Sequence, residues 1–568
     1  MIRTQSGADA SAAAMQSASR LSPTDGQQTV HAAFAAAASQ WPEHAFLCVT
    51  PGTAKAYGIS PGETSYRDAL SRIKRLSGLY RGAGYGHGHR VGLLLENRPE
   101  FIFHWFALNA LGVSVVPINA ELRAAELRYL IDHSGIILAV APSSRHASLA
   151  QAAQESGGAL ALMGPDESPP EAGCPAPHAA RSIDCTTECA LLYTSGTTGK
   201  PKGCILPNTY FLHAGGWYRD IGGLASLREG MERMLTPLPL VHMNAMAYSV
   251  MAMVMTGGCL ISLDRFHPRD WWDTVRDTHA TVVHYLGVMP AILMKAPETG
   301  QDTAHKVRFG FGAGIDRSLH QPFEQRFGFP LLEAWAMTET GAGVVIIANQ
   351  EPRFAGSSCF GREREDIEIR LENDAGQEAG VDEHGELLVR HAGSDPRYGF
   401  FAGYLKDEEA TREAWRGGWF HTGDIVRRNA QGYLHFVDRK KNVIRRSGEN
   451  IAAVEVESAL MAHPLIKAVA VAAAPDAVRG DEVLACVVPH VMPAPSEAAA
   501  LAREIVAWSL GQLAYYNVPG YIAFIDALPL TATNKIQRGE LKTMAAGLPG
   551  TGQCIDTRDM KKRQEMPT

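Results

Sequence analysis

The chain has 568 residues and a mass of 61.3 kDa, so at roughly 100–200 residues per domain it is expected to fold around more than one core. Hydrophobic residues make up 46% and charged residues 20%, and the formal charge is −7, which excludes a disordered chain and a basic surface for nucleic acid or anionic lipid. No stretch reaches the roughly 18–20 uninterrupted apolar residues of a membrane helix, so we expect a soluble protein without stable membrane association.

Helical and strand-like hydrophobic periods alternate through most of the chain. The predicted helices cover 69–82, 99–111, 124–133 and 270–278, and each leads into an apolar strand, at 90–96, 113–118, 136–142 and 280–288. Strands that alternate with helices of this length predict a layered α/β fold. The Gly-, Pro-, Ser- and Ala-rich stretch 150–187 is predicted to be a loop.

The pattern changes after Asp438. Helices are predicted at 453–462, 496–514 and from Gln537, and strands at 466–475, 482–491 and 521–528. These elements describe a compact α+β unit. The predicted organisation is therefore a large domain over 28–437, a polar hinge over 438–442 and a small domain over 443–547.

The two ends and the cysteines complete this outline. Residues 1–27 are rich in Ala and Ser and lack the apolar core of a secretory signal, so they are predicted to form a disordered leader, with a disordered tail over 548–568. The nine cysteines are scattered and include no C-x-x-C pair, so neither a disulfide framework nor a zinc site is predicted. This usage favours a cytoplasmic protein.

Two short patterns do not support the chemistry that they superficially match. The segment 58–62 fits the G-x-S-x-G pattern of a nucleophilic serine, but Pro61 has no backbone N–H to donate to an oxyanion. The glycine-rich run 82–88 lies between a predicted helix and a strand, whereas a dinucleotide-binding loop runs from a strand into a helix. We interpret this run as a helix cap and turn.

The strongest chemical signal is the segment 191–203, LLYTSGTTGKPKG. Glycines allow backbone N–H groups to turn toward an anion, hydroxyls add donors and lysines add positive charge, so the segment predicts a phosphate-binding loop. It is not a Walker A loop, because Lys200 is followed by Pro201 and not by Ser or Thr. The residues expected to hold phosphate in this loop are Thr194, Ser195, Gly196, Thr197, Thr198, Gly199 and Lys202.

This segment resembles the phosphate loop of the acyl-adenylate-forming superfamily, which includes acyl-CoA synthetases and peptide-synthetase adenylation domains. Four further segments resemble the other motifs of that superfamily in the same order. They are Trp335–Glu339, Trp419–Asp424, the stretch from Asp438 to Asn450, and Thr531–Ile536. The resemblance covers about residues 30–545, and 240–295 look most like the crotonobetaine/carnitine-CoA ligase branch.

The resemblance implies an ATP-dependent acid–CoA ligase that forms an acyl-AMP, releases pyrophosphate and then transfers the acyl group to CoA. Thr338 would bind the α-phosphate, Glu339 and Thr198 would bind Mg²⁺, and Asp424 with support from Arg439 would bind the ribose. The adenine slot would consist of Gly312, Ala313, Gly314, Glu333, Ala334 and Trp335.

The same resemblance assigns the small domain to both half-reactions. Lys535 would bridge the carboxylate and the α-phosphate during adenylation, and rotation about Lys441 would then withdraw it. The loop with Ser447, Gly448 and Glu449 would then approach CoA.

The acyl pocket is expected to include His242, Met243, Met246, Gly287, Gly314 and Gly341, with His242 near the acyl carboxylate. A quaternary-ammonium acid would prefer an aromatic or acidic cage, and the aromatic candidates are Trp217, Tyr218 and Tyr248. The sequence does not identify the small carboxylic acid, and it leaves a homodimer open. Two alternatives also stay open, an adenylating enzyme that loads a separate carrier protein or an amine and a non-catalytic nucleotide-binding protein.

Overall fold

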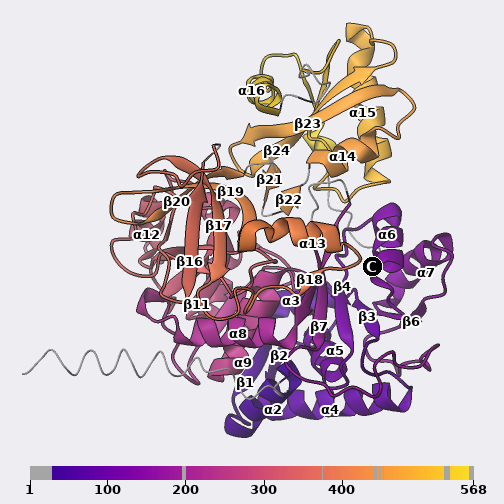
Figure 1. The fold of residues 1–568 in the computed structure, drawn as a ribbon, viewed down its shortest axis with the longest axis vertical. Coiled ribbons are helices and arrows are strands. Elements are labelled where there is room, and N and C mark those ends of the chain that lie inside the picture. The colour runs from indigo at the N-terminus through magenta and orange to yellow at the C-terminus, as the bar shows by residue number, and fades with distance from the viewer. Residues whose placement is uncertain are drawn as a thin grey trace, which may run out of the picture.

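The computed structural model describes residues 29–194, 200–373, 375–439, 444–447, 449–451, 453–529, 536 and 538–561. The predicted leader 1–27 therefore lies outside the described residues. Figure 1 shows a large body formed by the first part of the chain and a smaller unit, coloured orange to yellow, above it.

Two sheets form the centre of the large body. The first has the order β14 (Ile346–Ile347), β13 (Leu331–Trp335), β12 (Phe309–Ala313), β11 (Val282–Leu286), β9 (Arg233–Thr236), β10 (Cys259–Ser262), β1 (Ala45–Val49), β2 (Gly62–Ser65). The second has the order β18 (Gly403–Tyr404), β8 (Lys202–Pro207), β7 (Glu188–Thr194), β4 (Ser114–Pro117), β3 (Arg90–Leu93), β5 (Leu138–Val140), β6 (Ala161–Met163). Pairing is parallel through the middle of both sheets and antiparallel at β2, β14, β8 and β18.

Helices cover these two sheets (Figure 1). They are α2 (Val30–Gln40), α3 (Pro51–Tyr57), α4 (Tyr66–Gly82), α5 (Pro99–Asn109), α6 (Ala124–Ser134), α7 (His146–Glu155), α8 (Asn208–Asp220), a π-helix (Asn244–Val250), α9 (Met251–Thr256), α10 (Trp271–Asp277), α11 (Val288–Leu293) and α12 (His320–Phe327). Helix α5 begins with Pro99, whose missing N–H costs nothing in the first turn, and buries every side chain from Phe101 to Asn109. Most of the sheets and helices share one large hydrophobic core, and α6 and α7 pack on a second cluster against the β3–β5 region.

A third, antiparallel sheet completes the large body. Its order is β15 (Cys359–Gly361), β20 (Leu434–Arg439), β19 (Phe420–Arg428), β17 (His384–His391), β16 (Ile367–Glu372), and α13 (Glu408–Ala414) lies beside it.

The small unit has hydrophobic cores of its own. Its sheet runs β22 (Glu449–Ile451), β21 (Ile444–Arg446), β24 (Gly480–Pro489), β25 (Tyr521–Phe524), β26 (Ile555–Asp556), with β23 (Ile466–Asp476) also paired to β24. Its helices are α14 (Ala453–Leu460), α15 (Pro495–Leu510) and α16 (Arg538–Gly547). The predicted fold class, a large α/β domain followed by a small α+β domain, is confirmed.

The structure differs from the sequence-based expectation in two segments. The stretch 150–187, predicted as a loop, contains the end of α7 and the edge strand β6. Residues 548–561, predicted as part of a disordered tail, carry β26, and the buried Lys561 forms an ion pair with Glu482. A short strand and one buried lysine carry too little hydrophobic periodicity to be recognised in sequence. Residues 562–568 lie outside the described residues.

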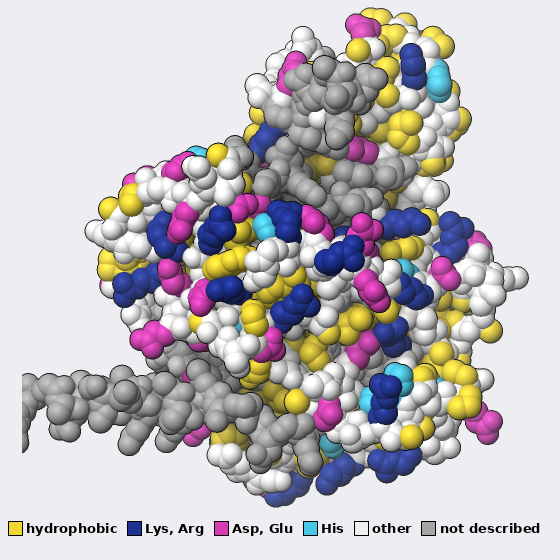
Figure 2. Space-filling view, viewed as in Figure 1, with side chains coloured by type: hydrophobic (Ala, Val, Ile, Leu, Met, Phe, Trp, Pro, Cys, Tyr) yellow, Lys and Arg dark blue, Asp and Glu magenta, His cyan; other side chains and the backbone are white. Residues whose placement is uncertain are grey.

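The structure describes the surface charge, the character of the helices and the state of the cysteines. Figure 2 shows basic and acidic side chains interspersed over the face drawn, rather than gathered into one basic field. Among the described helices, none combines the length and the apolar character that crossing a membrane requires. All nine cysteines are free thiols.

Candidate functional site

A cavity of about 1930 Å³ lies where the large body meets the small unit. It opens at the carboxyl ends of the parallel strands, because the terminal residues Thr194 of β7, Leu286 of β11, Ala313 of β12 and Trp335 of β13 all line it. Ligands of open α/β sheets bind at this edge. The small unit closes the cavity with Arg445, Glu449, residues 475–481, Tyr516 and Asn517.

The predicted phosphate loop joins two antiparallel strands at this edge. Thr194 ends β7, Lys202 begins β8, and the two residues are paired across the ladder and line the cavity. Lys202 lies over the Tyr404 ring, with its Nζ 4.8 Å from the centroid and 3.8 Å from a carboxylate oxygen of Asp407. Ser195, Gly196, Thr197, Thr198 and Gly199 lie outside the described residues.

Glu339 brings a buried carboxylate to the cavity. Glu339 is 7% exposed, and its Oε1 accepts a 2.9 Å hydrogen bond from the Tyr404 hydroxyl. Within the described chain no Lys, Arg or His forms an ion pair with it. Thr338 precedes it and lines the same wall. A buried carboxylate without a protein cation fits a magnesium ligand, and Mg²⁺ in phosphate-binding sites needs only one or two carboxylates. No cluster of three ligand side chains occurs among the described residues, so substrate oxygens would complete the shell.

The turn after β12 is held by Glu333. Its Oε2 accepts from the Gly314 N–H at 3.0 Å, while its Oε1 accepts from the Ile315 N–H at 3.2 Å and the Tyr285 hydroxyl at 2.8 Å. Burial raises the pKa of the Glu333 carboxyl despite these hydrogen bonds. Gly287 packs so closely on this turn that a Cβ would lie 1.6 Å from the Gly314 carbonyl oxygen. The loop Gly312-Ala313-Gly314 therefore has a fixed course along the cavity wall.

Trp335, at the end of the neighbouring strand β13, meets Asp424 at the cavity. The Trp335 indole N–H donates a 2.9 Å hydrogen bond to Asp424 Oδ2, and Asp424 is 1% exposed. Ala334, Trp335 and Asp424 all line the cavity. Arg439 pairs with Asp424 across the β19–β20 ladder, while its side chain lies outside the described residues.

The predicted acyl region is only partly exposed to the cavity. His242, Met243, Gly287 and Gly314 line it, together with Asn244 and Val288 of the same predicted segments. Phe311 also lines it, and the sequence did not single it out. Met246 is fully buried behind the wall. Gly341 is also outside the lining, where its carbonyl oxygen accepts a 3.0 Å hydrogen bond from the Tyr248 hydroxyl.

The three candidate cage aromatics are not equivalent. Tyr248 lines the cavity, whereas Trp217 and Tyr218 are fully buried and do not reach it. The buried polar group behind this wall is His284, whose Nδ1 lies 2.9 Å from Asn244 Oδ1 and whose Nε2 lies 3.1 Å from the Tyr218 hydroxyl. Burial lowers the pKa of His284 to about 3, so the imidazole is neutral and fixes the Asn244 amide.

The small unit reaches the acyl region through Glu449. A Glu449 carboxylate oxygen lies 3.8 Å from His242 Nε2. Desolvation lowers the pKa of His242, but the nearby Glu449 carboxylate outweighs it, so the pKa is raised. Ser447 does not line the cavity, and Lys441, Gly448 and Lys535 lie outside the described residues.

Two further lining residues, Tyr404 and Tyr516, were not identified by the sequence analysis. Tyr404 reaches Glu339 only because β18 pairs with β8, about 200 residues earlier in the chain. Tyr516 joins the two domains, since its hydroxyl accepts a 3.1 Å hydrogen bond from the Asn119 amide. Neither tyrosine belongs to a motif, so no local signal identifies it.

Comparison with known proteins places this geometry in a family. Residues 34–405 match the family described as AMP-binding enzyme, and residues 455–535 match the AMP-binding enzyme C-terminal domain. Crotonobetaine/carnitine–CoA ligases of Salmonella agona (strain SL483) and Salmonella typhi are 30% and 31% identical to the chain, with 84% of the chain and 93% of each relative covered.

Solved structures share the fold. A double mutant of o-succinylbenzoate CoA synthetase from Bacillus subtilis, bound with its product analogue, matches with a TM-score of 0.75 at 24% identity, covering 90% of this chain and 98% of that one. The same enzyme in complex with its acyl-adenylate intermediate has a TM-score of 0.61 at 24% identity, with 91% and 98% covered. An amide bond synthetase from Marinactinospora thermotolerans has a TM-score of 0.74 at 21% identity, with 90% and 99% covered. The chain belongs to the AMP-binding enzyme family.

Proposed function

We propose that this protein is an ATP-dependent acid–CoA ligase. The observation that carries the proposal is that one cavity gathers both ends of the phosphate loop, the carboxylates Glu339 and Asp424, and His242. The enzyme joins the carboxylate of an acid to the α-phosphate of ATP and releases pyrophosphate. The CoA thiolate then attacks the acyl carbonyl, and AMP leaves. The names of the Salmonella relatives support this reaction.

Each of these side chains has a distinct role in adenylation. Lys202 and the residues Thr194–Gly199 hold the β- and γ-phosphates, and Thr338 donates to the α-phosphate. Asp424, oriented by the Trp335 indole N–H, accepts hydrogen bonds from the ribose hydroxyls, with support from Arg439. Glu339 and Thr198 hold Mg²⁺, which neutralises phosphate charge when bound. Lys535 bridges the two reacting groups.

The position of the small unit supports a two-state cycle with a hinge at 438–442. Glu449 lies in the cavity beside His242, which suits the thioester-forming state. The higher TM-score with the product-analogue form than with the acyl-adenylate form of one synthetase points the same way. Rotation about Lys441 then brings Lys535 to the cavity for adenylation. Ser447 and Gly448 precede Glu449 in the sequence, and this loop is proposed to approach CoA.

The acyl wall favours a small or medium acid with one polar group. Met243, Val288 and Phe311 present apolar surface, and Asn244, fixed by His284, presents the amide. Of the predicted cage only Tyr248 is available, which does not favour a quaternary-ammonium acid. The proposed reaction needs no nucleic-acid or membrane partner and suits the cytoplasm.

The test is AMP release from ATP, Mg²⁺ and a panel of short, branched, aromatic, dicarboxylic and betaine acids, each with and without CoA. We expect CoA-dependent AMP from one acid class. Acid-dependent pyrophosphate exchange without CoA-dependent AMP would instead identify an enzyme that loads a carrier protein or an amine. No signal in either assay would leave an acid outside the panel or a protein that only binds nucleotide.

A variant separates the two half-reactions. Lys535→Ala is expected to abolish adenylation and to spare acyl transfer from pre-formed acyl-AMP to CoA, because Lys535 acts only in the first step. Both rates are measured on the same preparation. Equal loss of both half-reactions contradicts the two-state role of Lys535.

A further inference from the structure

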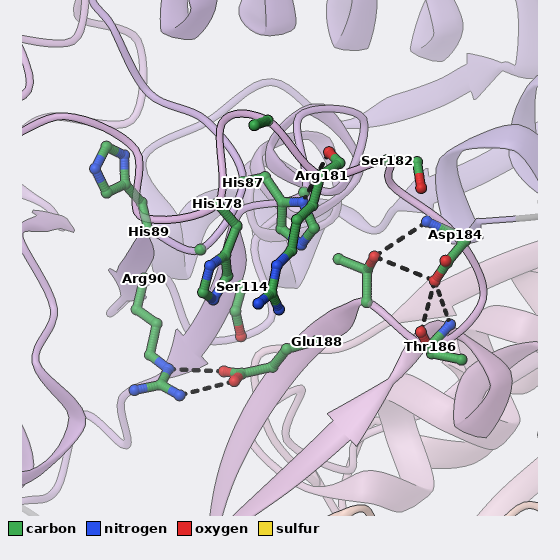
Figure 3. Close-up of a pocket in the computed structure, with 14 residues that line it drawn as sticks. His87, His89, Arg90, Ser114, His178, Arg181, Ser182, Asp184, Thr186 and Glu188 are labelled. Carbon is green, nitrogen blue, oxygen red and sulfur yellow. Dashed lines mark hydrogen bonds and ion pairs between the residues drawn. The ribbon is translucent and has the colours of Figure 1, made fainter.

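A second pocket, of about 780 Å³, lies at the amino ends of strands in the sheet that contains β3, β4 and β7, away from the catalytic cavity (Figure 3). The first residues of three neighbouring parallel strands line it, Arg90 of β3, Ser114 of β4 and Glu188 of β7. Strand β7 runs from Glu188 at this pocket to Thr194 at the catalytic cavity, which separates the two by about 20 Å at roughly 3.3 Å per residue. The pocket is therefore distinct from the catalytic cavity.

The rest of the lining comes from two loops. One is the glycine-rich turn after α4, with His87 and His89, and the other is the segment that leads into β7, with His178, Arg181 and Asp184. The His87 and His178 rings meet edge to face with centroids 5.4 Å apart. Figure 3 shows the Arg181 and His178 side chains directed toward Ser114, above the Arg90–Glu188 pair. Histidine, arginine and serine side chains thus converge from three segments.

Both carboxylates of the pocket are already engaged. Arg90 donates two hydrogen bonds of 2.7 Å to the two oxygens of Glu188, so this pair carries no net charge. Asp184 Oδ1 accepts from the Thr186 hydroxyl at 2.7 Å and from the Thr186 N–H at 2.9 Å, and these hydrogen bonds lower the pKa of Asp184. In the described chain, neither carboxylate forms an ion pair with Arg181.

Three donors of the pocket, in contrast, keep a free position among the described residues: the Arg181 guanidinium, the Ser114 hydroxyl and one nitrogen of His87. Among the described residues nothing forms a hydrogen bond or an ion pair with the Arg181 guanidinium. Ser114 is 3% exposed, and its hydroxyl has no hydrogen-bond partner in the described part of the chain. The His87 Nδ1 lies 3.3 Å from the Arg181 carbonyl oxygen and donates to it, which leaves Nε2 for another partner. A buried hydroxyl without a partner is costly, so a ligand oxygen at Ser114 would stabilise the site.

We propose that this pocket binds a small tetrahedral oxyanion, either inorganic phosphate or the phosphate of a small monoester. A guanidinium pairs with phosphate through two parallel N–H groups. The Ser114 hydroxyl and the imidazoles approach from other directions, which suits a tetrahedral anion better than a planar carboxylate. The site belongs to the large domain alone and does not depend on the identity of the acid.

The binding test uses Lys202→Met as the parent protein, because that change weakens phosphate binding at the catalytic loop. Calorimetric titration compares inorganic phosphate, glycerol phosphate and acetate. We expect saturable phosphate binding that Arg181→Gln weakens about tenfold or more and Ser114→Ala weakens several-fold. Arg276→Gln is the matched control, since it removes the same charge from α10, which does not line the pocket, and should leave the affinity unchanged.

The ligand panel distinguishes the sources of the phosphate group. Tighter binding of glycerol phosphate than of phosphate identifies a monoester site, and the reverse identifies an inorganic phosphate site. Equal affinity for acetate, or an affinity that Arg181→Gln does not change, overturns the proposal. Crystals soaked in arsenate give a second readout that needs no variant. Anomalous density between Arg181 and Ser114 is expected, and density at the catalytic loop alone overturns the proposal.

Discussion

Buried carboxylates in this protein fall into two groups, one inside the domains and one at the catalytic cavity. Glu232 in the large domain and Glu482 in the small one are fully buried. Glu232 is paired with two cations, and Glu482 is paired with three. Glu333 and Glu339 at the cavity are almost as buried, yet among the described residues their side chains accept only from neutral donors.

The pKa directions follow this division. Desolvation raises the pKa of Glu232, but hydrogen bonds from Arg228 and Thr281 and the charge of Arg308 outweigh it, and the net shift is downward. For Glu333 desolvation prevails, and the pKa is raised. The comparison teaches that a carboxylate paired with cations stabilises the fold, whereas one that only neutral groups hold is available to a ligand or a loop. Variants of the two groups should therefore differ in what they damage.

The largest expected effect is on folding, at Glu482. Glu482→Gln leaves Arg446 and Lys561 buried without their shared anion, and losing one partner of a buried pair costs about 3 kcal/mol or more. Scanning calorimetry should show a destabilised small domain. The control is Arg503→Gln, which breaks the exposed pair with Asp559 and should leave the transition unchanged. An unaltered transition in Glu482→Gln would contradict the structural role of this cluster.

The next effect is on catalysis, at Glu339. Glu339→Gln keeps the shape and the hydrogen bond from Tyr404 but removes the charge for Mg²⁺, and we expect kcat to fall on the order of 10²–10³-fold, as for other single charge-stabilising groups. Steady-state AMP release at varied Mg²⁺ measures it. The thermal transition should not move by more than a degree or two. Full activity with an unchanged Mg²⁺ dependence would remove Glu339 from the proposed metal site.

A smaller effect is expected at Trp335. Trp335→Phe keeps an aromatic ring but deletes the N–H that donates to Asp424, and a hydrogen bond to a charged group contributes about 1.5 kcal/mol or more. The KM for ATP should rise about tenfold, with a smaller change in kcat. Trp217→Phe is the matched control, because the buried Trp217 N–H has no hydrogen-bond partner among the residues that the structure describes. If both variants raise the KM equally, the indole–carboxylate contact has no specific role.

The smallest effect concerns pH, through Glu449 and His242. The raised His242 pKa means that their attraction stabilises the present domain arrangement below the ordinary His pKa of 6.5 and weakens as pH rises through the raised value. The His242 side chain is 45% exposed, so solvent screening keeps the effect small. Glu449→Gln should lower the His242 pKa, which NMR of labelled histidine detects, with His242→Phe assigning the signal. A His242 pKa that Glu449→Gln leaves in place would show that the two side chains do not interact in solution.

The sequence by itself determined the division into two domains, the alternation of strands and helices, and the family motifs. These features are local, because hydrophobic periodicity reports which face of each element is buried, and motif residues lie close together in the chain. Sequence reasoning also placed Thr194, Lys202, Glu339 and Asp424 in one site, and the cavity brings all four together.

Tertiary structure alone decided which groups hold these residues and which candidates reach the cavity. Tyr404 meets Glu339 through a β18–β8 pairing, Glu449 meets His242 through the placement of the small domain, and Met246 lies behind the wall. The glycine-rich turn with His87 is an ordinary helix cap in sequence and lines a pocket only because β3, β4 and β7 begin beside it. Contacts between residues hundreds of positions apart leave no local pattern, since they depend on how the sheets are ordered and not on any single element.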